Sequence, residues 1–152
     1  AASDVYKRQS TYSLVYTTSQ AYLGGVISTT GDIHFVPYNA AIGQKIDING
    51  VVSTYSLAYT VANAYCGGVL VNGEIIFIPS SAAVGQKINS SGVVSTYSLI
   101  YTAAQAYVSG LLSSNGDINF IPYNGNRGQK ISSLSSKPLN IALCCSPFLN
   151  KM

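Results

Sequence analysis

Apolar and polar positions alternate along short stretches of the chain. Residues 51–60 alternate with a period of two, and one of their two faces is mostly polar. Such alternation, rich in β-branched and aromatic residues, predicts a β-strand with one solvated side, which suits an outer strand of a sheet. Residues 64–71 contain Gly67-Gly68, a pair that a strand tolerates where another backbone approaches closely. We expect this second strand to be the innermost one.

Two further strands follow within the same unit. Asn72-Gly73 predicts a tight hairpin. Residues 74–79 are apolar on both faces, which predicts a middle strand that is buried on both sides, and Pro79 ends it because proline cannot donate to the ladder. Residues 85–89 form a short fourth strand. No segment has a period of 3.6, so the sequence predicts no helix.

The whole pattern occurs three times. Thr54-Tyr55-Ser56-Leu57 has copies at 11–14 and 96–99, and Gly43-Gln44-Lys45-Ile46 has copies at 85–88 and 128–131. The copies differ in length by one residue, and that difference lies in a hairpin tip, as expected of a repeated supersecondary unit. These spacings predict three units near residues 10–50, 51–92 and 93–131.

Four short strands in each unit of about 40–45 residues predict a β-propeller blade. The fold class is therefore all-β, a propeller-like array of about three four-stranded antiparallel blades. A β-solenoid is the alternative, although its coils are usually shorter and lack hairpins. Closed rings have about 4–8 blades, so we expect a fragment of a larger ring. Self-association is expected through the end blades, where Ile33, Phe35, Ile118 and Phe120 would lack a partner.

The second copy carries the text Gly67-Gly68-Val69-Leu70, then Asn72-Gly73, Ile75 and Pro79. It resembles a β-propeller repeat family of bacteria and protists whose blades have Gly-Gly-Val-Leu, Asn-Gly-x-Ile and Pro-x-Asn-Ala motifs. The resemblance covers residues 10–131 and implies the propeller fold, but it indicates little about function. Ser109-Gly110 and Ser80-Ser81 depart from the motif, which weakens the case for a ligand site repeated in every blade.

The two ends of the chain do not match the repeat. Residues 1–9 resemble a scar from sequencing or cloning, in which case the natural chain would begin further upstream. Residues 132–152 form a tail in which Leu139, Ile141 and Leu143 alternate with other residues. We expect part of this tail to act as a closing strand in the outer position of the last blade.

Composition narrows the classes of partner. Charged residues are 9% of the chain and the net charge is +3, with no basic cluster besides Lys7-Arg8, which argues against nucleic-acid binding. The longest apolar stretch is too short and too interrupted to span a bilayer, so no membrane partner is expected. The three cysteines show neither a disulfide framework nor metal-ligand spacing. The compartment cannot be assigned from these features.

Candidate catalytic groups are few. His34 is the only histidine, and Ile76 and Asn119 take its place in the other copies, so the sequence favours packing against a neighbouring blade over catalysis. No nucleophile motif or phosphate loop occurs. The sequence thus predicts no catalytic site, no metal site and no cofactor, and a protein that is not an enzyme.

Two kinds of charged residue recur once per copy. The carboxylates after the hairpin glycine are Asp32, Glu74 and Asp117. The lysines of the short strand are Lys45, Lys87 and Lys130. A ring of carboxylates could hold a hard cation, and a ring of ammonium groups could attract an anion. Solvated turns and protection of strand edges are the simpler interpretations, and we favour them.

Tyrosines and amides make the most suggestive surface. One loop contributes Tyr38, Asn39, Tyr123 and Asn124, and the loop before the inner strand contributes Gln20, Asn63 and Gln105. Both loops are expected on one face, where aromatic rings and amides suit recognition of a sugar or peptide. The sequence predicts a non-enzymatic binding or structural scaffold for an unknown protein or glycan. A glycan-binding lectin and a metal-dependent hydrolase are the alternatives.

Overall fold

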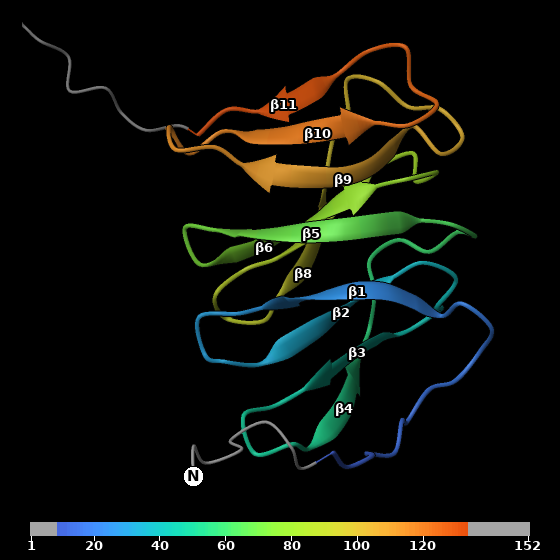
Figure 1. Ribbon diagram of the computed structural model, residues 1–152, viewed down its shortest axis with the longest axis vertical. Coiled ribbons are helices and arrows are strands. Elements are labelled where there is room, and N and C mark those ends of the chain that lie inside the picture. Colours follow the sequence, from blue (N-terminus) through green and yellow to red (C-terminus); the bar gives the residue numbers. More distant parts are fainter. Residues whose placement is uncertain (1–8, 134–152) are drawn as a thin grey trace, which may run out of the picture.

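The computed structural model describes residues 9–133, which form eleven β-strands in three antiparallel sheets (Figure 1). No helix occurs among these residues, which confirms the all-β prediction. Accordingly, the described part of the chain contains no helix long and apolar enough to cross a membrane.

Each sheet is a meander of consecutive strands. The first contains β1 (Tyr22–Ile27), β2 (Ile33–Pro37), β3 (Gly43–Ile46) and β4 (Val52–Tyr55). The second contains β5 (Tyr65–Val71), β6 (Glu74–Pro79), β7 (Gly85–Ile88) and β8 (Val94–Tyr97). The third contains β9 (Tyr107–Leu112), β10 (Ile118–Pro122) and β11 (Gln129–Ile131).

The predicted boundaries of the units are displaced by one strand. The strand that contains the Thr-Tyr-Ser motif is the last strand of its sheet, because β4 pairs with β3 and places Tyr55 opposite Gly43. The reason is the turn between them, in which the Asp47 carboxylate accepts hydrogen bonds from the backbone of Asn49 and Val51 and holds β4 beside β3. Alternation alone does not tell which neighbour a strand joins. Residues 9–21, which include the first copy of this text, contain no strand.

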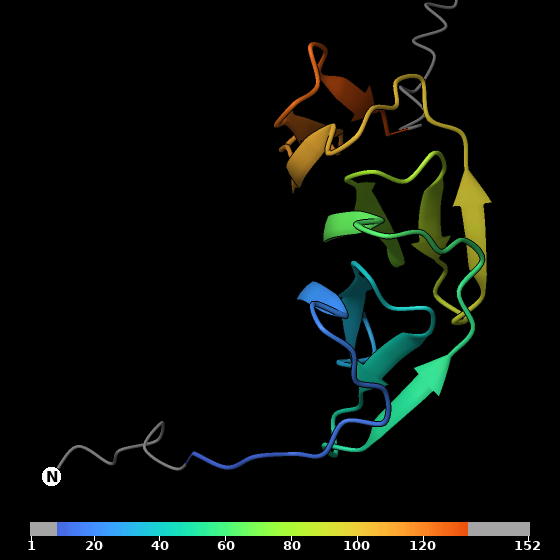
Figure 2. The same ribbon diagram turned by 90° about the vertical axis from the view of Figure 1, so that its right-hand side faces the viewer.

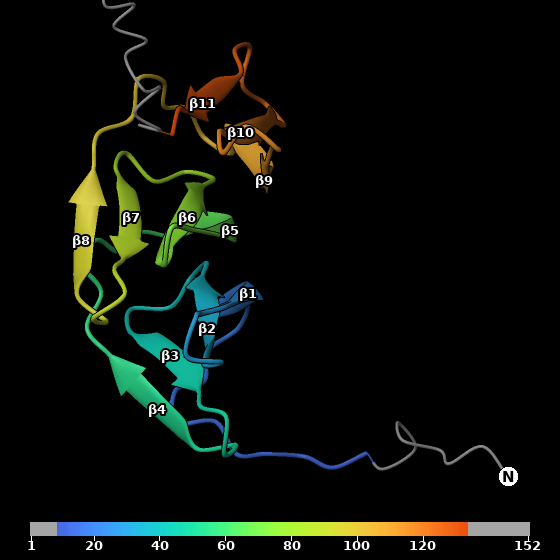
Figure 3. The ribbon, with the colours of Figure 1, turned by 90° about the vertical axis from the view of Figure 1, so that its left-hand side faces the viewer.

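The three sheets stack face to face in an arc (Figures 2 and 3). The inner strands β1, β5 and β9 lie on the concave side, while β4 and β8 lie on the convex side. A Cβ atom added to Gly68 on β5 would meet Val26 of β1, so the glycine allows the inner strands to approach closely. This confirms the inner position that the glycine pair predicted.

Two apolar clusters fill the junctions between sheets. Ile75 and Phe77 of β6 face the first sheet, and Ile76 and Ile78 of the same strand face the third. Fully burying such a side chain stabilises the fold by about 1.5–3 kcal/mol. The prediction that residues 74–79 form a strand buried on both faces is therefore confirmed.

The residues expected to be exposed at the ends of the array are corrected in part. Ile118 and Phe120 are 1% and 3% exposed, because their face of β10 packs on the second sheet. Ile121 on the opposite face is 38% exposed instead. Ile33 is exposed on the first sheet, as expected, and Phe35 is half-buried. The predicted closing strand of residues 132–152 lies almost wholly outside the described residues.

Candidate functional site

The loops predicted to bind a ligand join neighbouring sheets. The Asn63 backbone N–H donates to Asn39 Oδ1 at 2.8 Å, and the Ala64 N–H donates to the Tyr38 carbonyl at 2.8 Å. The next junction repeats both bonds with serines: the Gln105 N–H donates to Ser81 Oγ, and the Ala106 N–H donates to the Ser80 carbonyl. Asn39 and Asn63 are thus brought together at the first junction, and Gln105 forms the equivalent structural link at the second.

Ser80-Ser81 replaces Tyr-Asn without loss of this link. The link persists because Asn39 Oδ1 and Ser81 Oγ each accept a bond from a backbone N–H of the next sheet. Tyr123 remains 65% exposed, and the Asn124 amide donates to Gln105 Oε1. A ligand-binding role for Tyr38, Tyr123 and the amides stays a prediction.

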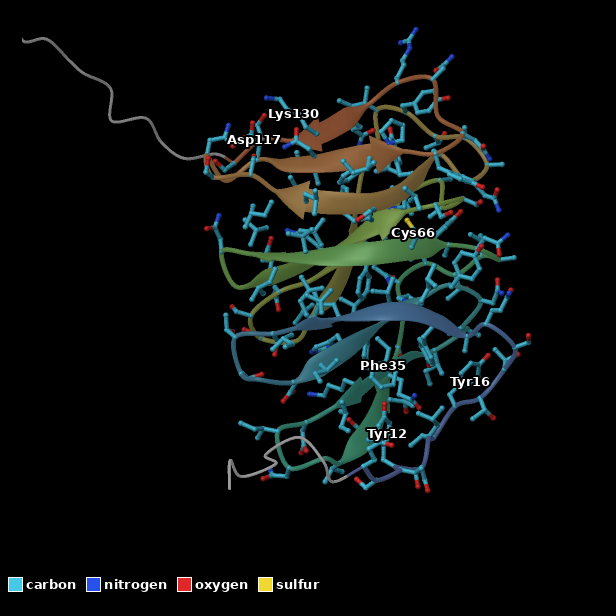
Figure 4. The ribbon with its side chains drawn as sticks, viewed as in Figure 1. Tyr12, Tyr16, Phe35, Cys66, Asp117 and Lys130 are labelled. Atoms are coloured by element: carbon cyan, nitrogen blue, oxygen red, sulfur yellow. The ribbon has the colours of Figure 1, made fainter. Side chains whose placement is uncertain are left out.

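The repeated carboxylates and lysines form ion pairs within each sheet. Lys45 Nζ lies 2.6 Å from Asp32 Oδ2, Lys87 Nζ lies 3.0 Å from Glu74 Oε2, and Lys130 Nζ lies 2.9 Å from Asp117 Oδ2. Figure 4 shows the last pair at the hairpin end of the third sheet. The hydrogen bond from Lys130 lowers the pKa of Asp117. Each carboxylate is therefore paired with a lysine of its own sheet, and the two kinds of residue do not form separate rings of charge.

His34 lies on β2 and faces the junction with the second sheet. It is 7% exposed, its ring meets that of Tyr55 edge-on with centroids 5.4 Å apart, and Nδ1 is buried without a partner among the described residues. Burial lowers the pKa of His34 below its ordinary value of 6.5, Lys45 lowers it further, and Asp32 opposes them. The imidazole is consequently neutral at neutral pH.

A cavity of about 190 Å³ opens at the hairpin side of this junction. From the first sheet it is lined by Ser28, Thr30, Asp32, His34 and Lys45, and from the second by residues 88–92 among others. A neutral imidazole therefore shares a cavity with an ammonium group that a carboxylate holds in place. Such an arrangement can accept a proton and stabilise developing negative charge.

Other chemistries find less support in residues 9–133. No three His, Cys, Asp or Glu side chains of these residues come together as metal ligands would. Cys66 Sγ lies 3.2 Å from the Tyr107 carbonyl, and burial raises the pKa of its thiol to about 11. The thiol is therefore protonated at neutral pH, and it is a poor nucleophile there.

The sequence matches no protein-family model, and no curated protein matches it. Solved structures do match. A streptogramin B lyase is 23% identical with a TM-score of 0.63, over 76% of this chain and 39% of that one. Virginiamycin B lyase from Staphylococcus aureus, in its selenomethionine form, is 25% identical with a TM-score of 0.62 over the same shares. A catalytically inactive histidine-to-alanine variant of that lyase, with quinupristin, is 26% identical with a TM-score of 0.61, over 77% and 40%.

These matches confirm the propeller-like fold, and the matched region spans about two fifths of the lyase chains. They also contradict the prediction of a non-enzymatic scaffold, because the similar proteins are enzymes. His34 is buried at the junction with the second sheet, as the packing prediction expected, and it also borders the cavity.

Proposed function

We propose that this chain is part of a lyase built on a propeller-like fold, and that the cavity beside His34 takes part in its chemistry. The proposal is supported by the structural similarity to lyases, which covers about three quarters of this chain. One of those lyases is catalytically inactive when a histidine is replaced by alanine. The observation that carries it is local: the only histidine of the sequence borders a polar cavity.

A lyase eliminates a leaving group without water or an oxidant. A base removes a proton from carbon, the C–H electrons form a new double bond, and the leaving group departs with the electrons of its own bond. Neutral His34 supplies the base, since an imidazole that carries no proton on one nitrogen can accept one. Lys45, held by Asp32 at 2.6 Å, stabilises the negative charge that develops on the substrate.

Quinupristin is the first substrate to test, because one of the similar lyases carries it. The 190 Å³ cavity is too small to enclose a large molecule, so we expect it to receive only the reacting part. Since the match covers 39–40% of the lyases, we expect further blades to supply the rest of the substrate site.

The test compares His34→Asn with the unaltered sequence in this chain and in any longer protein that contains it. Asn119 holds the same position on β10, so the fold accepts asparagine there. Quinupristin cleavage, followed by mass spectrometry, should fall by roughly 10²–10⁴-fold with no change in the thermal unfolding midpoint. The rate should rise with pH through a pKa below 6.5 and then level off, because the base must be neutral.

Asn119→Ile is the matched control, because Ile76 occupies the same position in the second sheet and Asn119 lies away from the cavity. It should leave cleavage unchanged. Full activity in His34→Asn would remove His34 from the mechanism. Absence of both cleavage and binding of quinupristin in every form would overturn the proposed substrate.

A further inference from the structure

The third sheet keeps a place for a tyrosine on its outer edge. In the first two sheets the outer strand sets Tyr55 opposite Gly43 and Tyr97 opposite Gly85. A Cβ atom on either glycine would overlap the tyrosine ring. Gly128 is the equivalent glycine, and no atom of the described residues lies within 4 Å of the position its Cβ would take. The edge of β11 is therefore shaped for a fourth strand that carries a tyrosine.

The other end of the chain carries the sequence of such a strand. Ser10-Thr11-Tyr12-Ser13-Leu14 is identical to residues 53–57 and 95–99, which contain most of β4 and β8. At the first position the same five residues form no strand, and Tyr12 is 56% exposed. Tyr12 lies at the far end of the stack from Lys130 of β11, so the two cannot meet within one molecule of this shape (Figure 4).

We propose that residues 10–14 of a second copy of this chain pair with β11 and complete the third sheet. The register of the complete sheets fixes the arrangement. Tyr12 lies opposite Gly128, Thr11 opposite Gln129 and Ser10 opposite Lys130, as Tyr55, Thr54 and Ser53 lie opposite Gly43, Gln44 and Lys45. Main-chain hydrogen bonds supply affinity in such strand addition, and the tyrosine site supplies specificity.

The segment that follows the donated strand is already held in the required form. Gln44 Oε1 accepts hydrogen bonds from the backbone N–H groups of Val15 and Tyr16 at 3.0 and 2.9 Å. Gln86 Oε1 holds the connector after β4 in the same way, through two bonds of 2.8 and 2.9 Å. The donated strand therefore leads into the donor's first sheet as β4 leads into the second sheet, and the donor's first sheet stacks on the acceptor's third.

The stacked surfaces match the two internal junctions. The Tyr123 carbonyl and Asn124 Oδ1 take the places of the Tyr38 carbonyl and Asn39 Oδ1, which accept bonds from the next sheet. Gln20 and Ala21 carry the corresponding N–H groups, and Gln20 has a φ of 52°, close to the 55° of Asn63. The apolar surfaces also correspond, since Ile121 and Ile33 are each 38% exposed at opposite ends of the stack.

The contact joins two different surfaces, so each added copy leaves one end of each kind until a ring closes. Sedimentation velocity over a hundredfold range of concentration should show mass rising with concentration. Tyr12→Ala and Gly128→Leu should each weaken association by at least tenfold, one by removing the ring and the other by filling its place. Tyr12→Phe is the matched control and should associate far more strongly than Tyr12→Ala, because it keeps the ring. The hydroxyl of the equivalent Tyr55 has no partner among the described residues, and that of Tyr97 donates a single bond to the Phe77 carbonyl.

Cross-linking tests the register in a background where Cys144 and Cys145 are serine. A Ser10→Cys protein mixed with a Lys130→Cys protein should form a disulfide-linked dimer that neither variant forms alone. Ser132→Cys in place of Lys130→Cys lies outside the paired residues and should give little product. A monomer at every concentration, or equal cross-linking by both, would overturn the proposal. A Gly128→Leu protein that is monomeric and unfolded would also overturn the proposal. That result would mean that the site is occupied within one molecule, by the chain's own tail, and not by a second copy.

Discussion

Strands β6 and β10 have nearly the same sequence and very different surroundings. From Ile75 and Ile118 onward they read Ile-Ile-Phe-Ile-Pro and Ile-Asn-Phe-Ile-Pro. Ile78 of β6 is 0% exposed, while the equivalent Ile121 of β10 is 38% exposed. Pro79 is likewise fully buried and Pro122 is exposed. The difference lies in neighbours, since β6 has a sheet on each side and β10 has one on a single side among the described residues.

The comparison shows that a blade does not bury its own core. In a stack of repeats each unit contacts only its neighbours, so stability is the sum of unit and junction contributions. Ile121 at the end of the stack therefore contributes little to the free energy of unfolding, and the equivalent Ile78 in the middle contributes much. The proposed strand exchange between copies would remove this difference by giving β10 its second neighbour.

The largest expected effect comes from truncating the equivalent isoleucines. Ile78→Ala should lower the free energy of unfolding by about 2–5 kcal/mol, because it removes buried methyl groups and leaves a cavity. Ile121→Ala should cost less than about 1 kcal/mol, since its side chain already meets solvent. Urea unfolding, at a protein concentration too low for association, measures the free energy of unfolding of both variants. Equal losses would mean that something already covers β10 in the monomer.

The sequence predicted the strands well because period-two alternation and glycine position are local signals. The two-sided burial of residues 74–79 and the inner position of Gly67-Gly68 both followed from them. It could not predict that β4 closes the sheet before it, since both the preceding and the following neighbour satisfy the same pattern. Nor could it predict that residues 10–14 lack a partner within the described chain, because their text is identical to that of strands that have one.

The candidate site was harder to predict for a related reason. Ion pairs such as Lys87 with Glu74 join neighbouring strands at positions 13 residues apart, and the sequence shows them only as two separate rows. The link from Asn39 to the next sheet depends on a backbone N–H, which no side-chain motif reveals. His34 is a candidate from the sequence as its only histidine, but the cavity that it borders is formed by two sheets and does not show in the sequence.

A smaller effect is expected at the glutamines that hold the connectors. Gln86 is 0% exposed and accepts two backbone hydrogen bonds, so Gln86→Met should leave two N–H groups unsatisfied and cost about 1–3 kcal/mol. Gln129 makes the same two bonds from a half-buried position. Gln129→Met should cost less, because water can replace the lost acceptor. Hydrogen exchange at Ala58 and Tyr59 should accelerate in the first variant, and a larger loss in the second would contradict the comparison.

The smallest effect is expected at the ion pair between Lys130 and Asp117, and it depends on pH. Lys130 lowers the pKa of Asp117 below its ordinary value of 3.8, chiefly by the hydrogen bond between them. Because the folded pKa lies below the unfolded one, the carboxylate stabilises the fold above pH 3.8, and this contribution is lost as the pH falls through the lowered value.

Lys130→Gln should raise the pKa of Asp117 toward 3.8, though not fully, because the N–H of Ser133 and the Asn115 side chain still donate to the carboxylate. Lys130→Arg keeps a cationic donor and should keep the pKa low. An NMR titration of the Asp117 carboxyl measures the pKa, and urea unfolding between about pH 5 and pH 2 measures the stability that depends on it. If Lys130→Gln left both unchanged, the Ser133 and Asn115 bonds rather than the ion pair would hold the carboxylate.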